Sequence, residues 1–257
     1  MVSQNDSNQS PGGKKPTCGV PSKADLEGVQ QSLNAEYRAQ FDQAIALGKA
    51  DDLQGAAELA RMAIKASEAK EGSHEASVIL TFLPALYPGA PLSEFRKVAY
   101  RAVELLDGRP HCEFLLSHAR FYTMQVELRA DQKPAALKEA ESCVSAGKAS
   151  KTHGRWLATA WRYYGMLLAL SGRMPEALVA MSNAIDLAKH MPTDDPLALA
   201  RAYDAIGRTL LEMRRANEAV VSLCNALDEF TRQGRQSSRE ALETKMLIQR
   251  ASKSETQ

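Results

Sequence analysis

The chain has 257 residues, of which 44% are hydrophobic and 25% are charged, as in ordinary globular proteins. Its formal net charge of +1 gives no sign of a nucleic-acid partner. The longest apolar runs, such as Met166–Leu170, are far too short to span a membrane, and the N-terminus lacks the apolar core of a signal peptide. We therefore expect a cytoplasmic protein that binds neither a membrane nor nucleic acid.

The N-terminal segment differs in composition from the rest of the chain. Residues 1–22 are rich in Ser, Gln, Asn, Gly and Pro and have almost no apolar side chains. Because such a segment cannot bury enough apolar surface to fold, we predict a disordered tail. Residues 23–251 are predicted to form one all-α domain, with a disordered end at 252–257. Helices are expected at residues 24–48, 52–70, 74–87, 93–107, 111–131, 134–148, 153–172, 175–190, 196–214 and 217–233, with a last one over about 237–250.

Chemical signals mark several of these helix boundaries. Ser93 is expected to cap its helix through its hydroxyl, and Asp195–Pro196 supplies a cap followed by proline at the first helical position. The acids Asp51–Asp52 also stand at a helix start, so capping explains them better than acid–base catalysis does. The sequence YPGAP at 87–91 is expected to end the helix before it.

The clearest element is a helical hairpin over Trp161–Ala184. Gly172 suits the end of its first helix and Pro175 the start of its second. A large aromatic residue fills the open end of the hairpin, and small residues stand where the two helices must approach closely. The residues that carry this pattern are Trp161, Gly165 and Leu168 on the first helix and Ala177, Met181 and Ala184 on the second.

The same order of bulky and small residues recurs along the chain, as a stacked array of hairpins requires. Shifted by 42 residues, it is repeated by Tyr203, Gly207, Leu210, Ala219, Leu223 and Ala226. A degenerate copy lies 41 residues upstream at Arg120, Met124, Glu127, Ala136, Ala140 and Cys143. Two weaker copies precede it, at Ile79, Leu83, Phe95, Ala99 and Ala102 and at Ala44, Leu47, Ala56, Ala60 and Ala63. We therefore predict five helix pairs.

This pattern resembles the tetratricopeptide repeat, in which a bulky residue, a glycine, an alanine, a second bulky residue and a second alanine follow in that order. The resemblance implies an α-solenoid, a right-handed superhelix of stacked antiparallel helix pairs. The period exceeds the usual one of about 34 residues, and it resembles the repeats of MalT-like and Rap-like regulators and of kinesin light chains. We expect the segment at about 237–250 to cap the end of the solenoid; the alternative is a helix that docks on a partner.

Nothing in the sequence indicates catalysis. It has no nucleophile elbow, no zinc-protease motif and no dinucleotide-binding glycine loop. Histidines are expected in surface or capping roles. The cysteines are expected to be small buried hydrophobes in a reducing compartment, with disulfide or metal chemistry as the alternative; they are Cys18, Cys112, Cys143 and Cys224. We expect no catalytic residue, no cofactor and no metal, and therefore no enzyme.

The family resemblance also implies a concave groove lined by the first helix of each pair. The family's contact positions fall on His118, Phe121, Gln125, Leu128 and Arg129; on Thr159, Arg162, Met166, Ala169 and Leu170; and on Arg201, Asp204, Arg208, Leu211 and Glu212. Nine of these form the predicted peptide-binding groove: His118, Phe121, Gln125, Arg129, Arg162, Met166, Arg201, Asp204 and Arg208. The alternative is an ordinary solvated helix face.

The chemistry of these side chains suggests the partner. Arginine forks bind carboxylates, and a neighbouring Phe or Met can hold an apolar group. We expect an acidic protein or peptide with apolar anchors, and we expect Arg162, Arg201 and Arg208 to converge on its carboxylates. The Lys and Asn with which chaperone-binding members clamp a C-terminal carboxylate are absent here. The function predicted is a non-enzymatic scaffold or adaptor, and the alternative is a ligand- or peptide-sensing regulatory module that sequesters its partner. The oligomeric state stays open.

Overall fold

The structure is a computed structural model that describes residues 37–150, 156–190 and 195–254. Its first helix covers residues 37–49. The helices after it are α2 Leu53–Ser67, α3 Gly72–Gly89, α4 Leu92–Leu106, α5 Glu113–Arg129, α6 Lys133–Ala149, α7 Leu157–Leu170, α8 Met174–His190, α9 Ala198–Glu212, α10 Ala216–Arg232 and α11 Arg239–Ser254. These ranges contain no strand, so the predicted all-α class is confirmed. The predicted tail at 1–22 lies outside the described residues.

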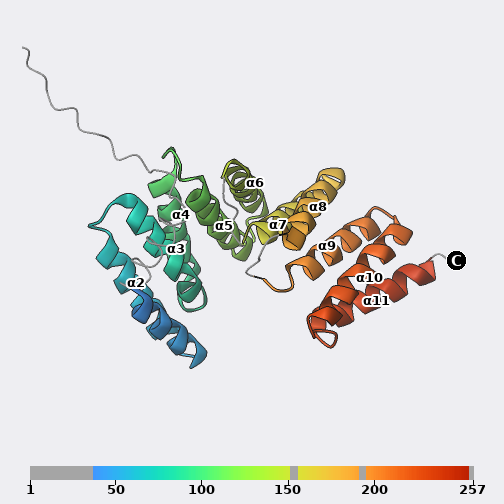
Figure 1. Cartoon of the computed structure of the whole chain (residues 1–257), viewed down its shortest axis with the longest axis horizontal. Helices are drawn as coiled ribbons and strands as arrows, with labels where there is room; N and C mark the ends of the chain where they lie inside the picture. Colours follow the sequence, from blue (N-terminus) through green and yellow to red (C-terminus); the bar gives the residue numbers. More distant parts are fainter. Residues whose placement is uncertain (1–36, 151–155, 191–194, 255–257) are drawn as a thin grey trace, which may run out of the picture.

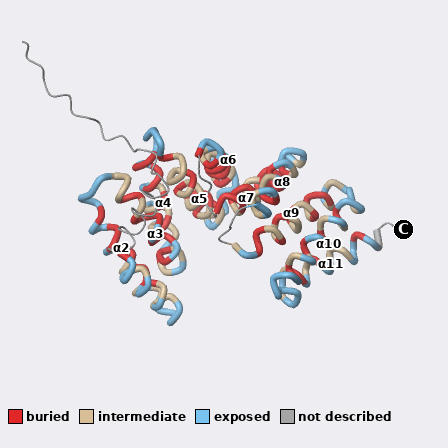
Figure 2. Tube along the Cα trace, in the orientation of Figure 1, coloured by how far each residue is buried: buried red, intermediate tan, exposed pale blue. Residues whose placement is uncertain are grey.

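Consecutive helices pack against one another along an elongated arc (Figure 1). Helices α3/α4, α5/α6, α7/α8 and α9/α10 form hairpins, and α11 stacks on the last of them. The first helices of neighbouring pairs also touch, α3 with α5 and α7 with α9. Buried residues follow the faces between helices, whereas many outer faces and turns are exposed (Figure 2). The predicted solenoid of stacked antiparallel pairs with a capping helix is confirmed.

A residue with a left-handed backbone conformation, that is, a positive φ, follows the first helix of a pair at regular intervals. Gly172 follows α7 with φ of +78°. Its N–H donates to the carbonyl of Ala169 and the N–H of Arg173 to that of Leu168, each at 2.9 Å. These bonds satisfy carbonyls that a helix end leaves without donors, so Gly172 has the predicted terminal role. The same conformation recurs at Asp51, Asp131 and Arg214, with φ of +66°, +53° and +59°.

The turn between α3 and α4 departs from this pattern and from the prediction. Helix α3 contains Pro84 and Pro88 and continues to Gly89, although the sequence predicted an end at residue 87. Both prolines are exposed and lie one turn apart. Their missing N–H groups therefore leave carbonyls on a side that water reaches, which makes proline tolerable inside the helix.

The predicted caps are partly corrected. The Asp52 carboxylate accepts the Gly55 N–H at 2.9 Å and caps α2, as predicted. Helix α4 instead begins at Leu92 after Pro91, so Ser93 lies inside the first turn and makes no cap bond. Asp195 accepts the N–H of Leu197 at 2.9 Å, but α9 begins only at Ala198. In the first case Pro91 takes the cap position, and in the second a turn at residues 196–197 separates Asp195 from the helix.

Size complementarity within each pair explains the repeat pattern. A Cβ on Gly165 would stand 2.6 Å from the Met181 Cγ, and one on Gly207 would stand 2.5 Å from the Leu223 Cγ. In the third pair Met124 takes the place of the glycine and is fully buried. It belongs to the same core cluster as Ala140, the residue opposite. The large side chain has therefore changed helices, and the volume between the two helices is still filled.

Buried ion pairs accommodate the other irregular residues of the third pair. Glu127 is buried and accepts a two-pronged bond from Arg96 of α4. Glu139 is also buried and accepts bonds from Arg120 and Thr123, each at 2.8 Å. Because the charged groups are paired, this pair can bury carboxylates at positions where its neighbours are apolar.

The cysteine prediction holds for two residues and is wrong for a third. Cys112 and Cys143 are buried, and burial raises the pKa of the Cys143 thiol to about 12, so it stays protonated. Cys224 is exposed. It follows Leu223, which occupies the core face of α10, and one residue of helix rotates its side chain by about 100° away from that face. Cys18 lies outside the described residues.

Candidate binding groove

A groove of about 570 Å³ lies between α7 and α9 and reaches the start of α11. Its walls combine apolar and charged side chains from the first helices of the fourth and fifth pairs. Helix α7 contributes Arg162, Tyr163, Met166, Ala169 and Leu170; α9 contributes Arg201, Asp204, Ala205, Arg208, Thr209 and Glu212; Met181 and Glu240 complete it.

Helix α7 supplies an apolar ridge that begins at an arginine. Arg162, Met166 and Leu170 are four residues apart and therefore lie on one face of the helix. Met166 is 36% exposed and Leu170 is 64% exposed. The sequence pattern places them at contact positions, and the structure explains their exposure because they face the groove and not the core between α7 and α8.

Arg162 is held by weak contacts alone. Its Nη1 lies 3.2 Å from the Sδ of Met166, and its guanidinium carbon lies 4.3 Å from the centre of the Tyr163 ring. Its Nε is buried and has no hydrogen-bond partner. Among the described residues no carboxylate forms an ion pair with it. A buried donor without an acceptor costs about 1–3 kcal/mol. A carboxylate or carbonyl that enters the groove and accepts a hydrogen bond from this guanidinium would therefore remove that cost.

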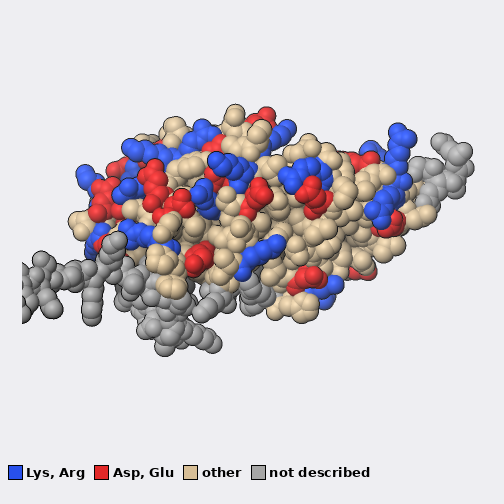
Figure 3. Space-filling view, turned by 90° about the horizontal axis from the view of Figure 1, so that it is seen from above, with Lys and Arg blue, Asp and Glu red and all other residues tan. Residues whose placement is uncertain are grey.

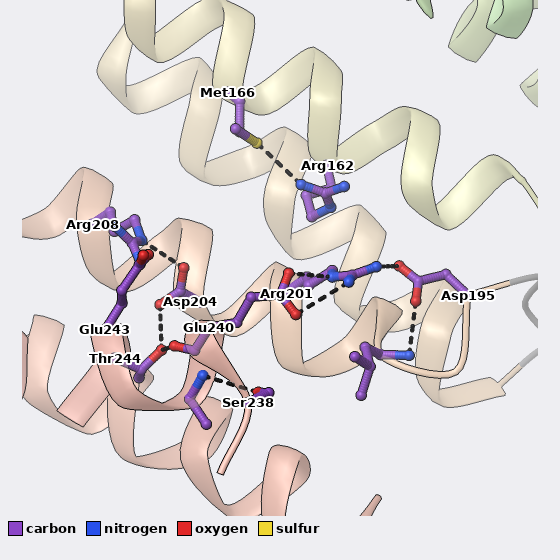
Figure 4. Close-up of polar contacts among 12 residues, drawn as sticks. Arg162, Met166, Asp195, Arg201, Asp204, Arg208, Ser238, Glu240, Glu243 and Thr244 are labelled. Atoms are coloured by element: carbon purple, nitrogen blue, oxygen red, sulfur yellow. Dashed lines mark hydrogen bonds and ion pairs between the residues drawn. The ribbon is translucent and has the colours of Figure 1, made fainter. Parts of the chain in front are cut away.

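Arg201, in contrast, is already engaged by carboxylates of its own chain. It donates to Asp195 at 2.8 Å and to both carboxylate oxygens of Glu240 at 2.9 and 3.1 Å (Figure 4). These bonds, the one to Glu240 first, raise the pKa of Arg201 above its ordinary value.

Arg208 is paired as well. Its Nε lies 2.6 Å from Asp204 and its Nη2 lies 3.7 Å from Glu243 of α11. Asp204 also accepts the hydroxyl of Thr244 at 2.8 Å (Figure 4). The expected convergence of three arginines on one partner is therefore corrected: two of them join α9 to α11. Besides Asp195 and Asp204, their acidic partners lie on α11, more than thirty residues downstream, and first-helix spacing alone does not indicate them.

The four predicted residues of the third pair lie outside this groove. The His118 ring stacks on Trp156 with centroids 3.9 Å apart, and burial lowers the pKa of His118 to about 3. Phe121 packs against two core clusters. Gln125 is half-buried. Of the nine predicted residues, five therefore line the groove, namely Arg162, Met166, Arg201, Asp204 and Arg208.

Arg129 joins two neighbouring pairs. It donates to the carbonyl of Tyr87 at 2.9 Å and lies 4.2 Å from the centre of the Tyr87 ring. That carbonyl would ordinarily accept the N–H of residue 91, which is proline and has none. Arg129 thus satisfies the end of α3 from α5.

Sequence reasoning missed five of the residues that line the groove, two of which come from α8 and α11. Met181 belongs to α8, yet it reaches the groove because Gly165 leaves room for its side chain. The bulky residue opposite a glycine was the available signal. Tyr163, Ala205 and Thr209 lie beside predicted contact positions, and Glu240 arrives with the capping helix.

The charged residues that line the groove are of both signs. Figure 3 shows lysines and arginines interspersed with acidic residues over the visible face, with no continuous basic stripe.

Across the described residues no group of three or more His, Cys, Asp or Glu side chains could hold a metal ion. No helix of the described chain has the length and apolar character needed to cross a bilayer.

Solved structures of other proteins share this arrangement of helices. The apo form of RapI is 14% identical, with a TM-score of 0.67, covering 84% of this chain and 81% of its own. A putative kinesin light chain of Podosopora anserina with nearly identical TPR-like repeats is 13% identical, with a TM-score of 0.60 and coverages of 78% and 97%. The fold is that of a tetratricopeptide-repeat (TPR) solenoid.

A third TPR-fold neighbour was solved with a ligand. PlcR of Bacillus thuringiensis, in complex with the peptide PapR7 and DNA, is 15% identical, with a TM-score of 0.57 and coverages of 86% and 84%. No family model matches the chain, and no curated protein matches it in sequence. The likeness is thus one of fold, at identities where function does not follow from it.

Proposed function

We propose that this TPR solenoid is a non-enzymatic adaptor that binds a peptide or helix of another protein in the groove between α7 and α9. The observation that carries the proposal is Arg162, a guanidinium with a buried, unbonded Nε at the head of an exposed apolar ridge. Every other arginine of the groove already has carboxylate partners. The proposed setting is the cytoplasm, where a reducing environment keeps Cys224 a thiol.

The groove favours a particular ligand chemistry. One carboxylate of the partner would bond the Arg162 guanidinium, where a charge-assisted bond is stronger than a neutral one. An aliphatic or aromatic side chain beside it would lie on Met166 and Leu170, which are flexible and apolar and adapt to different shapes. The peptide bound to PlcR, a protein of the same fold, supports a peptide ligand for this chain.

A random peptide library displayed on phage tests the proposal without a known partner. Peptides selected on the wild-type chain are measured by fluorescence anisotropy against Arg162→Met, which keeps an unbranched, flexible side chain and removes the guanidinium with its charge. We expect binding to weaken by about tenfold or more, which corresponds to about 1.4 kcal/mol. Met166→Glu should weaken it further, because it places a negative charge where the partner is acidic.

The matched control is Val179→Glu on α8. Val179 is 65% exposed and lies outside the groove, so this variant adds the same charge elsewhere on the surface. Selected peptides that bind Arg162→Met and Met166→Glu as tightly as they bind wild type would remove the function from this groove.

A further inference from the structure

Helix α11 has two faces of opposite character. Its inner face packs on the preceding pair through Ala241, Thr244 and Ala251, all buried. Its acids point the same way, because Glu240 bonds Arg201 and Glu243 lies beside Arg208 (Figure 4). Helix α11 thus packs on α10 through small buried residues and is joined to α9 by ion pairs.

The outer face of α11 is formed by Arg239, Leu242, Lys245, Met246, Gln249 and Arg250, all exposed. Leu242 and Met246 are large apolar residues, each 50% exposed and one turn apart. The charged residues of this face are all basic, and the acidic Glu243 lies at its edge. Arg239 is paired with Glu243 at 2.8 Å, whereas no ion pair joins Lys245 or Arg250 to any described residue.

The repeat shows what this outer face corresponds to. A shift of 41 residues places Thr244, Ile248 and Ala251 on Tyr203, Gly207 and Leu210, so α11 stands as the first helix of a sixth pair. In the fifth pair, the face of α9 that receives α11 includes Arg201, Asp204 and Arg208. The same shift carries these three onto Leu242, Lys245 and Gln249. The outer face of α11 is therefore the position at which this solenoid would receive its next helix.

We propose that the outer face of α11 binds an amphipathic, acidic helix of a partner protein, stacked on α11 as α11 is stacked on α9. Leu242 and Met246 supply the apolar contact, and Lys245 and Arg250 attract the acids that flank it. A second copy of this chain fits poorly, because two basic faces repel and the acids of α11, Glu240 and Glu243, are already paired with arginines of the same chain. This surface is separate from the groove of the proposed adaptor function.

The test uses a displayed library of helical peptides about 16 residues long, or about four turns. It is selected on the full wild-type chain and counter-selected on Leu242→Glu/Met246→Glu. We expect the recovered helices to carry apolar residues three and four apart, flanked by Asp or Glu. Their affinity should fall by about tenfold or more on the counter-selected variant and on Lys245→Glu/Arg250→Glu. Circular dichroism melts establish that both variants stay folded, since the replaced side chains are exposed.

The control is Val221→Glu on α10, which changes an apolar residue of similar exposure, 62%, away from α11. It should leave binding unchanged. Recovery of helices that are not acidic, or of none that distinguishes wild type from the α11 variants, overturns the proposal.

Two other occupants are tested with the chain alone. Sedimentation equilibrium would assign the face to a second copy if the wild type forms dimers that Leu242→Glu/Met246→Glu abolishes. Cosedimentation with phosphatidylserine vesicles would assign it to an anionic membrane if the same variant abolishes that binding. Either result replaces the partner helix and overturns the proposal.

Discussion

Exchanging the volumes of Gly165 and Met181 should reveal how each helix pair closes. A side chain on Gly165 would meet the Met181 Cγ at 2.6 Å and the carbonyl oxygen of Ala177, which is backbone, at 2.9 Å. Gly165→Met therefore overpacks the hairpin and should lower the free energy of unfolding by about 1–3 kcal/mol or more. Met181→Ala leaves a cavity and should lower it by about 2–5 kcal/mol.

The double variant Gly165→Met/Met181→Ala recreates the arrangement that the third pair has naturally, with Met124 on one helix and Ala140 on the other. Independent effects would sum to about 3–8 kcal/mol. We expect the double variant to lose clearly less than this sum, because the new methionine fills the space that the old one left, while the contact with the Ala177 carbonyl remains. Urea unfolding followed by circular dichroism gives all the values needed for the cycle. A double variant that loses the full sum would refute the account of size exchange between paired helices.

Three further predictions concern the turns, the third pair and the cap. Arg214→Gly should raise the free energy of unfolding by about 0.5–1 kcal/mol in thermal melts, because Arg214 holds φ of +59°. Gly172→Ala at the matching turn should lower the free energy of unfolding, and a destabilised Arg214→Gly variant would contradict this reasoning. Burial lowers the pKa of His118 from 6.5 to about 3, so its neutral form stabilises the fold fully above pH 6.5 and this contribution is lost as pH falls toward 3. His118→Phe should flatten the decline of stability between about pH 6 and 4 in urea titrations at several pH values, and an unchanged slope counts against the burial of this ring. Glu240→Gln/Glu243→Gln should speed amide hydrogen exchange in α11 but not in α3, since these acids hold α11 to α9; equal exchange in both proteins would show that apolar packing alone holds the cap.

The sequence predicted the fold well because the repeat depends on residue size at fixed spacing. Gly165 and Gly207 stand where a Cβ would collide with the facing helix, so their positions indicate the closest approach of two helices. Gly172 marks a helix end through its backbone conformation. The errors fall where a single residue was interpreted without its surroundings. Pro84 and Pro88 lie inside α3 because both face water. Helix α4 begins at Leu92, one residue before the predicted cap Ser93.

The site was less predictable because its electrostatics depend on contacts distant in sequence. Position alone made Arg162, Arg201 and Arg208 equivalent. In the structure, Arg201 and Arg208 are paired with acids of their own surroundings and of α11, whereas Arg162 has no carboxylate partner among the described residues. His118 and Arg129 occupy contact positions of their repeat, yet Trp156 and the carbonyl of Tyr87 engage them within the fold.

A crystal structure of the full chain with a peptide selected from the random library would locate the binding site. We predict that the peptide lies between α7 and α9, with a carboxylate bonded to the Arg162 guanidinium and an apolar side chain on Met166 and Leu170. A peptide bound elsewhere, with Arg162 still in contact only with Tyr163 and Met166, would contradict it.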